Sequence, residues 1–272
     1  MPVIMDKVEL SPNVYRIEVD APLVATRRRP GQFVIVRAND ESERIPLTIV
    51  DSDPIAGTIT LIYQALGEGT KFLAKLEMGD EIRDVAGPLG RATELSYVGK
   101  VVCVGGGIGV APLYPIVRGL KELANEVTVV MGARNSNLLI LEDEMREIAD
   151  EVIIATDDGS RGFHGFVSGA LQERIDAGFD PKLCVTIGPL PMMRSVAEVT
   201  RPYGIHTIVS LNPIMVDGTG MCGGCRVTVN GERKFACVDG PEFDGHAVDY
   251  AELANRQRMY RDHEHCSIRS AV

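Results

Sequence analysis

Hydrophobic and polar residues alternate with a period of two over much of the first third of the chain. The clearest alternating runs cover residues 14–19 and 58–63, and a short apolar run over 32–37 follows the turn residues Pro30 and Gly31. Runs of this kind without helical patterns between them are typical of antiparallel strands. The pattern therefore predicts a small antiparallel β-barrel or sandwich over residues 1–96.

Two short segments of this predicted barrel carry polar groups that suit a phosphorylated flat cofactor. Residues 44–48 read Arg-Ile-Pro-Leu-Thr, which places a cation and a hydroxyl on an otherwise apolar strand. A short helix is predicted after residues 67–70, with Gly69 and Thr70 at its amino end, where free N–H groups favour an anion. Each segment alone could equally be an exposed strand and an ordinary helix cap.

The pattern changes after Tyr97 to buried strands that alternate with helices. Strands are predicted at residues 100–104, 126–131, 151–155, 182–187 and 206–211, and helices at about 110–124, 138–148, 168–176 and 192–201. This alternation predicts a parallel sheet with right-handed crossovers, and a nucleotide would bind at the carboxyl ends of its strands.

A glycine run follows the first of these strands. It lacks the third glycine of the common dinucleotide fingerprint, because Val110 occupies that position, but it fits Gly107-x-Gly109-x-x-Pro112. A strand-to-helix turn without side chains lets a pyrophosphate approach the backbone. Loops that end neighbouring strands contain Arg134, Asp157, Asp158 and Gly188, and these could line the same crevice or form simple turns.

Charge and composition narrow the possible partners and location. The formal net charge is −10 and the isoelectric point is about 5.1, which argues against a nucleic acid or an anionic membrane as the partner. The longest uncharged stretch, residues 101–117, is broken by glycine and proline and is too short to span a bilayer. Without a visible secretory signal, we expect a cytoplasmic protein whose cysteines are thiols or metal ligands.

Three of the six cysteines fall within a short glycine-rich segment. Cys222 and Cys225 have CxxC spacing, and a predicted hairpin with Asn230-Gly231 at its turn would return Cys237 toward them. A zinc site would need a fourth ligand, for which His246 is the nearest downstream candidate. A 2Fe-2S loop of the plant type would place Asp217 at its first ligand position. A redox-active dithiol is the third alternative.

The order of these modules resembles the ferredoxin reductase-like superfamily. The motifs that carry the resemblance are Arg-Ile-Pro-Leu-Thr, Gly-Glu-Gly-Thr, Gly-x-Gly-x-x-Pro and the cysteine segment with Cys-Val-Asp-Gly-Pro at residues 237–241. Within the superfamily the chain resembles the electron-transfer subunit of dihydroorotate dehydrogenase. It is still more similar to the small subunit of NADH-dependent reduced ferredoxin:NADP⁺ oxidoreductase, also known as the sulfide dehydrogenase beta subunit.

The resemblance implies an FAD-binding barrel over residues 1–96, an NAD(H)-binding α/β domain over 97–212 and a 2Fe-2S domain with a tail over 213–272. The implied flavin residues are Arg44, Ile45, Pro46, Leu47, Thr48, Ile62, Tyr63, Gln64, Gly69 and Thr70. The implied nicotinamide dinucleotide residues are Gly107, Ile108, Gly109, Arg134, Asp157, Asp158 and Gly188. The implied cluster ligands are Asp217, Cys222, Cys225 and Cys237.

The resemblance also implies an activity. We expect a flavin and iron–sulfur oxidoreductase subunit that passes electrons between NAD(H), FAD and the cluster, with Thr48 tuning the flavin N5 by a hydrogen bond. Its expected partner is a larger subunit with a second FAD and 4Fe-4S clusters, where electrons from NADPH bifurcate to ferredoxin and, through this chain, to NAD⁺. Asp217 favours this type, because the dihydroorotate relatives carry four cysteine ligands. The alternatives are a dihydroorotate dehydrogenase subunit, a stand-alone ferredoxin or flavin reductase, and a zinc-stabilised module without redox activity.

Two further segments allow more than one interpretation of the sequence. Arg134 is compatible with either NADH or NADPH, because an arginine there can meet a 2′-phosphate or stack on adenine. The segment from residue 248, with Tyr250, Leu253 and Met259, could contact a partner or lie on the barrel. The end of the chain, residues 261–266, includes His263, His265 and Cys266 and matches no motif, so we expect a polar terminus there.

Overall fold

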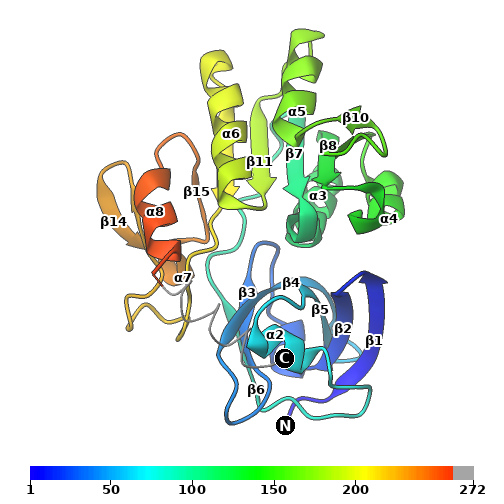
Figure 1. The fold of residues 1–272 in the computed structure, drawn as a ribbon, viewed down its shortest axis with the longest axis vertical. Coiled ribbons are helices and arrows are strands. Elements are labelled where there is room, and N and C mark those ends of the chain that lie inside the picture. Colours follow the sequence, from blue (N-terminus) through cyan, green and yellow to red (C-terminus); the bar gives the residue numbers. More distant parts are fainter. Residues whose placement is uncertain (260–272) are drawn as a thin grey trace. The chain divides into compact units, whose positions relative to one another are not determined.

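The computed structural model describes residues 1–259 and forms two compact units that cut across the order of the chain (Figure 1). The first unit contains residues 1–92, 212–241 and 249–259, and the second contains residues 93–211 and 242–248. The cysteine segment therefore folds with the N-terminal barrel. The expected functional division at residues 96 and 212 stays a prediction. The polar terminus expected at residues 261–266 lies outside the described residues.

The first unit is built on a six-stranded antiparallel barrel. Its sheet order is β1-β2-β5-β4-β3-β6, and main-chain hydrogen bonds from Ile4 to Asp80 and from Ile82 to Pro2 join the segment before β6 to the start of β1. The elements are β1 (Ile4–Ser11), β2 (Val14–Asp20), α1 (Pro22–Ala25), β3 (Phe33–Arg37), β4 (Ile45–Asp53), β5 (Thr58–Gln64), α2 (Glu68–Leu73) and β6 (Asp84–Leu89). The predicted barrel, its three strand runs and the short helix are all confirmed.

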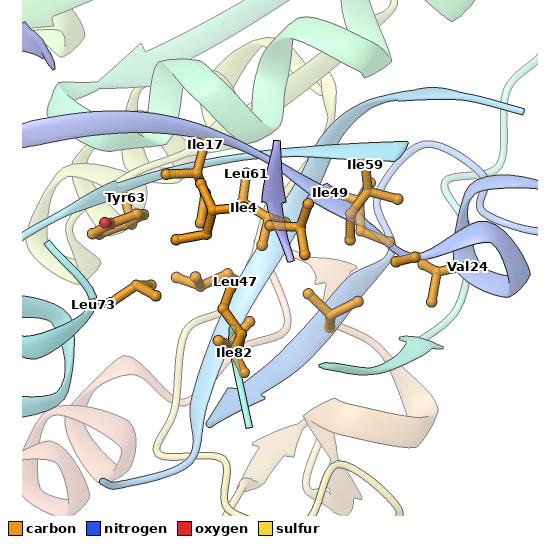
Figure 2. Packing of buried hydrophobic residues seen from close by; sticks show 14 of the residues in the cluster. Ile4, Ile17, Val24, Leu47, Ile49, Ile59, Leu61, Tyr63, Leu73 and Ile82 are labelled. Carbon is orange, nitrogen blue, oxygen red and sulfur yellow. The ribbon is translucent and has the colours of Figure 1, made fainter. Parts of the chain in front are cut away.

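Alternation along the strands fills the barrel with aliphatic side chains (Figure 2). Residues at every second position point inward, as Ile59, Leu61 and Tyr63 do on β5. Ile4, Ile49 and Leu73 are fully buried in the same core, so α2 is anchored on the barrel by its last residue. Burial of a side chain of this size stabilises the folded state by about 1.5–3 kcal/mol.

The second unit contains a seven-stranded sheet in the order β10-β9-β8-β7-β11-β12-β15. Its strands are parallel except for β15, which pairs antiparallel with β12 at the edge of the sheet. The elements are β7 (Lys100–Gly106), η1 (Gly107–Gly109), α3 (Val110–Glu122), β8 (Glu126–Ala133), η2 (Ser136–Leu138), α4 (Glu142–Ile148), β9 (Glu151–Thr156), β10 (Phe163–His164), α5 (Val167–Asp176), β11 (Leu183–Ile187), α6 (Leu190–Thr200), η3 (Arg201–Tyr203), β12 (His206–Ser210) and β15 (Glu242–Asp244).

The expected strand–helix alternation is confirmed, with three differences. The edge strand β10 was not predicted, because its two residues are too few to form a pattern. The predicted helix over residues 138–148 is a 3₁₀ turn followed by the shorter α4, because Leu141 adopts a left-handed conformation (φ 56°) that interrupts it. The antiparallel β15 was not predicted, since its few residues follow the cysteine segment in sequence. None of the helices within residues 1–259 has the length and apolar character needed to cross a membrane.

The cysteine segment adds a hairpin and two helices to the first unit. They are β13 (Arg226–Val229), β14 (Glu232–Phe235), α7 (Ala236–Asp239) and α8 (Tyr250–Gln257). The predicted hairpin is confirmed, with Asn230 and Gly231 both at positive φ in its turn. Helix α8 is capped by Asp249, whose side chain accepts a hydrogen bond from the Glu252 N–H, and it buries Leu253.

Candidate functional site

The β13–β14 hairpin brings two cysteines of the predicted cluster site together. The Sγ atoms of Cys225 and Cys237 are 3.1 Å apart, and the N–H of Cys237 donates to Cys225 Sγ at 3.5 Å. Both thiols are buried, whereas Cys222 is exposed. Among residues 1–259, no three His, Cys, Asp or Glu side chains lie within reach of one metal ion, so Cys222 and Asp217 stand farther from this pair.

Asp217 closes the loop that precedes the CxxC pair. One of its carboxylate oxygens accepts a hydrogen bond from the Thr219 N–H at 2.9 Å, and the other accepts from the Cys222 N–H at 2.8 Å. These main-chain hydrogen bonds, from Thr219 first and then Cys222, lower the pKa of Asp217 below its ordinary value. The side chain is therefore a carboxylate beside a predicted ligand cysteine, which is the form that can bind iron.

The buried thiols differ from the carboxylate in their protonation. Burial, together with its neighbour Cys225, raises the pKa of Cys237 to about 12. The thiol is therefore protonated at neutral pH until a metal ion displaces the proton. Burial also raises the pKa of Cys103 and Cys184, which lie within the seven-stranded sheet, so these two act as inert core residues.

Donor chemistry in this loop fits an iron–sulfur cluster better than zinc. Soft thiolates select iron–sulfur clusters as well as zinc, but glycines at 218, 220, 223 and 224 leave main-chain N–H groups free to hydrogen-bond sulfur. One such bond is present, from the Gly224 N–H to Cys222 Sγ at 3.5 Å. His246, the candidate fourth zinc ligand, belongs to the other unit and contacts Thr200 Oγ1 through Nε2 at 3.0 Å.

The cluster loop packs directly against the barrel. A Cβ placed on Gly218 would lie 2.6 Å from Leu89 Cδ1 and 3.1 Å from Ile35 Cγ1, and the φ of Gly218 is +75°. Only glycine meets both constraints. A Cβ on Gly90 would similarly lie 3.1 Å from Pro241 Cδ. The predicted cluster site and the predicted flavin site therefore belong to one compact unit.

Strand alternation divides the predicted flavin residues between two faces of the barrel. Ile45, Leu47 and Tyr63 pack in or against the core. Tyr63 is only 1% exposed, and its hydroxyl has no hydrogen-bond partner among the described residues, so this residue can meet a flavin only through its main chain. The members that alternate with these, and so point to the opposite face, are Pro46, Thr48, Ile62 and Gln64, and Arg44 directly precedes β4.

The start of α2 packs against the first residue of β4. A Cβ placed on Gly69 would lie 3.0 Å from Ile45 Cδ1 and 3.7 Å from the Cβ of Glu43, next to Arg44. Thr70 Oγ1 accepts hydrogen bonds from the N–H groups of Leu66 and Gly67. The structure thus brings the two predicted flavin segments together around a position where a side chain would fill the available space. This arrangement fits a cofactor with a pyrophosphate.

The glycine turn of the second unit is packed as a dinucleotide site requires. Gly107 has a φ of +55°, and a Cβ placed on it would meet no atom within 4 Å, so its surroundings are open. A Cβ on Gly109 would collide with the Ile187 carbonyl and would lie 2.8 Å from the Gly188 Cα. Gly107, Ile108 and Gly109 form η1, and they therefore lie against Gly188 at the end of β11. The structure thus brings these two turns together, while their role in binding a dinucleotide stays a prediction.

The remaining predicted nucleotide residues meet at the ends of β8 and β9. The Asp158 N–H donates to the Arg134 carbonyl at 3.2 Å, and the Asp157 N–H donates to the Ala133 carbonyl at 3.1 Å. Arg134, Asp157 and Asp158 are all exposed. Hydrogen bonds from Ser160 lower the pKa of Asp158, which keeps it ionised. These side chains can contact the adenosine ribose of a dinucleotide.

Sequence reasoning missed one group beside the cluster loop. Arg256 of α8 donates to the Gly224 carbonyl at 3.0 Å, and the adjacent Gln257 donates to the Asn212 carbonyl at 3.0 Å. The only sequence signal was an amphipathic stretch after residue 248, which does not reveal its packing partner. Of the two expectations for that stretch, the structure places Leu253 in the interior of this chain's own first unit.

Two family models match separate parts of the chain. Residues 103–198 match an oxidoreductase NAD-binding domain. Residues 212–249 match the iron–sulfur cluster binding domain of dihydroorotate dehydrogenase B. The two matches fall on the glycine turn with its parallel sheet and on the cysteine segment.

Two similar proteins align with nearly the whole chain. A homologue of the electron transfer subunit of dihydroorotate dehydrogenase B (NAD(+)) from Thermotoga maritima is 46% identical over 265 residues, which is 97% of this chain and 93% of that protein. An uncharacterized protein from the adh 3′ region of Clostridium beijerinckii is 46% identical over 269 residues, covering 96% of this chain and 91% of that protein.

Solved structures with the same fold include a chain of the NADH-dependent reduced ferredoxin-NADP oxidoreductase, an enzyme of flavin-based electron bifurcation. That chain superposes on this one with a TM-score of 0.94 at 44% identity, covering 99% of this chain and 97% of that chain. The cytochrome b5 reductase domain of Ulva prolifera nitrate reductase, at 18% identity and a TM-score of 0.62, shares the fold alone over 75% of this chain and 92% of that domain. The chain is thus an oxidoreductase of the ferredoxin reductase-like fold that binds FAD, NAD(H) and a 2Fe-2S cluster, and it belongs to the family of dihydroorotate dehydrogenase B electron transfer subunits and their homologues.

Proposed function

We propose that this chain is the small, NAD(H)-binding subunit of an electron-bifurcating NADH-dependent ferredoxin:NADP⁺ oxidoreductase. The observation that carries the proposal is the superposition with that enzyme over 99% of this chain and 97% of the matched chain at 44% identity. Asp217 supports it, because three cysteines and one aspartate are what the resemblance implies for this type.

Each predicted site has a definable task in this function. The open turn at Gly107 and the packed turn at Gly109 and Gly188 would bind the dinucleotide pyrophosphate. The outward face with Thr48, together with Arg44 before β4, would hold the flavin and its phosphates, with the Thr48 hydroxyl as the hydrogen-bonding group for the ring. When bound, FAD supplies the conversion between two-electron hydride chemistry and single electrons.

The cluster ligands divide into two pairs. Cys225 and Cys237, with Sγ atoms 3.1 Å apart, would bind one iron, and Asp217 and Cys222, joined by a hydrogen bond, would bind the other. Because the Gly218 contact holds this loop on the barrel, the chain keeps its cluster and flavin sites in one unit. None of these tasks requires a nucleophile or a general acid.

The proposed partner is a larger flavoprotein subunit with a second FAD and 4Fe-4S clusters, and ferredoxin reacts through that subunit. We place the complex in a reducing compartment such as the cytoplasm. The five cysteines within the described residues support this placement, since all of them are free thiols.

A second candidate is the electron transfer subunit of dihydroorotate dehydrogenase, which the names of several relatives support. Purification of this chain from its native cells, followed by identification of the co-purifying polypeptide, separates the two. A larger subunit containing FAD and 4Fe-4S clusters is the expected result. A small FMN protein with dihydroorotate dehydrogenase activity would overturn the proposal in favour of the second candidate, and full ferredoxin-dependent turnover by this chain alone would overturn both.

A further inference from the structure

Helix α8 contacts the cluster loop at two places. Its C-terminal residues donate one hydrogen bond to each end of the segment from Asn212 to Gly224, through Gln257 and Arg256 respectively. The helix is itself fixed on the hairpin, because the Asp249 N–H donates to the Thr228 carbonyl at 2.9 Å and Leu253 is 1% exposed. The loop with Asp217 and Cys222 is therefore held from outside by a rigid element.

Gly224 connects this contact to a predicted ligand. Its carbonyl accepts the hydrogen bond from Arg256, while its own N–H donates to Cys222 Sγ at 3.5 Å. A Cβ on Gly224 would lie 3.6 Å from the same sulfur, so the backbone passes close to it. An N–H group that donates to a cysteine sulfur withdraws charge from it and raises the reduction potential of an iron–sulfur cluster.

Arg256 also places a positive charge beside the loop. Arg256 is half-buried, and a guanidinium remains charged at any physiological pH. A nearby cation stabilises the more negative, reduced state of a cluster. Arg258, two residues further along, is exposed, and its side chain makes no hydrogen bond to the loop among the described residues.

We propose that Arg256 is a positioning residue for the 2Fe-2S site: it holds Gly224 so that the Gly224 N–H stays directed at Cys222 Sγ, and it keeps the reduced cluster stable. This inference rests on the proposed function, because it requires a cluster at this loop. Arg256 itself lies outside the predicted ligand set, on helix α8, whose packing the sequence did not predict.

The test compares Arg256→Gln with Arg258→Gln, which removes the same charge from the same end of α8. The purified full chain is loaded with iron and sulfide. Two quantities are measured: the midpoint potential, by redox titration followed by electron paramagnetic resonance, and the rate at which a chelator removes iron. Loss of a group that supports a metal ligand typically weakens a site by ~10-fold. We expect Arg256→Gln to lower the potential and to release iron ~10-fold faster than wild type, with Arg258→Gln unchanged.

Equal potentials and iron-loss rates in the two variants would overturn the inference. Should Arg256→Gln not fold, Arg256→Lys is measured in its place, because lysine keeps the charge but not the planar donor group. We expect faster iron loss from Arg256→Lys as well, and an iron-loss rate equal to that of wild type would contradict the positioning role. Hydrogen exchange of the Cys222–Cys225 amides in the metal-free chain is measured alongside. A wild-type chain that takes up no cluster would count against the proposed function, whereas unchanged exchange in Arg256→Gln would count against the inference itself.

Discussion

The Sγ atoms of Cys225 and Cys237 lie 3.1 Å apart although the two residues are twelve positions apart in the sequence. The hairpin between them creates this proximity, since it folds β14 back along β13. Both thiols are buried in the same unit as the barrel. The hairpin therefore brings together two of the four predicted cluster ligands.

Substitution of either cysteine should abolish the cluster. We expect Cys225→Ala to remove the iron and the cluster absorbance and to leave FAD bound, because the flavin residues lie on other elements. Iron analysis and the visible spectrum measure both. The matched control is Cys103→Ala, another buried thiol, which should keep full iron and lose about 1 kcal/mol of stability. Full iron content in Cys225→Ala would contradict the ligand assignment.

Gly69 should be essential for flavin binding. The new Cβ of Gly69→Ala would lie 3.0 Å from Ile45 Cδ1, so Ile45 or the start of α2 must shift and displace the two predicted flavin segments relative to each other; we expect at least a ~10-fold loss of FAD affinity. Titration of the apoprotein with FAD, followed by flavin fluorescence, gives the affinity. Gly67→Ala is the control, because a Cβ there meets no atom within 4 Å and its φ of −87° suits any residue. Equal affinities in the two variants would refute the site.

Two glycines of the nucleotide turn should respond differently to alanine. Gly109→Ala forces a methyl group into the Ile187 carbonyl, so we expect a loss of about 1–3 kcal/mol of stability together with weaker NADH binding. In Gly107→Ala the methyl group meets no protein atom, so the free energy of unfolding falls by only about 1 kcal/mol, because alanine is strained at the positive φ. The methyl group does enter the space proposed for the dinucleotide, so NADH should bind more weakly. Urea unfolding and the Michaelis constant for NADH separate the two effects. Normal NADH binding in Gly107→Ala would argue against the turn as the pyrophosphate site.

Glu242 should make stability depend on pH. Burial raises the pKa of this carboxyl to about 7, although Thr93 Oγ1 donates to it at 2.6 Å. The folded state therefore holds a proton that the unfolded state releases near its ordinary value of 4.5. Stability should fall as the pH rises from about 4.5 to about 7, by up to ~3 kcal/mol, and should fall no further above that range.

The comparison of wild type with Glu242→Gln tests this dependence. The glutamine stays neutral, so the variant should match wild type at pH 4 and unfold at a higher urea concentration at pH 8. Glu147→Gln, at an exposed position of α4, is the control and should follow wild type at both values. A Glu242→Gln variant less stable than wild type at pH 8 would show that the carboxylate is stabilised in the fold.

Local patterns were sufficient to predict most elements. Alternation along residues 14–19 and 58–63, and the Asn230-Gly231 turn, specify strands and a hairpin through interactions between near neighbours. Contacts that join distant segments left no such signal. The strand β15 crosses to the nucleotide sheet after the cysteine segment, and Arg256 reaches a carbonyl 32 positions away. Tyr63 shows a third limit: the motif included it, but strand alternation directs its ring into the core.

The most direct test of the account is anaerobic addition of NADH to the purified chain, with visible and electron paramagnetic resonance spectra recorded before and after. We expect a coloured protein in which NADH bleaches the flavin band and produces the signal of a reduced 2Fe-2S cluster. A colourless, zinc-containing protein, or one in which the flavin is bleached and no cluster signal develops, would contradict it.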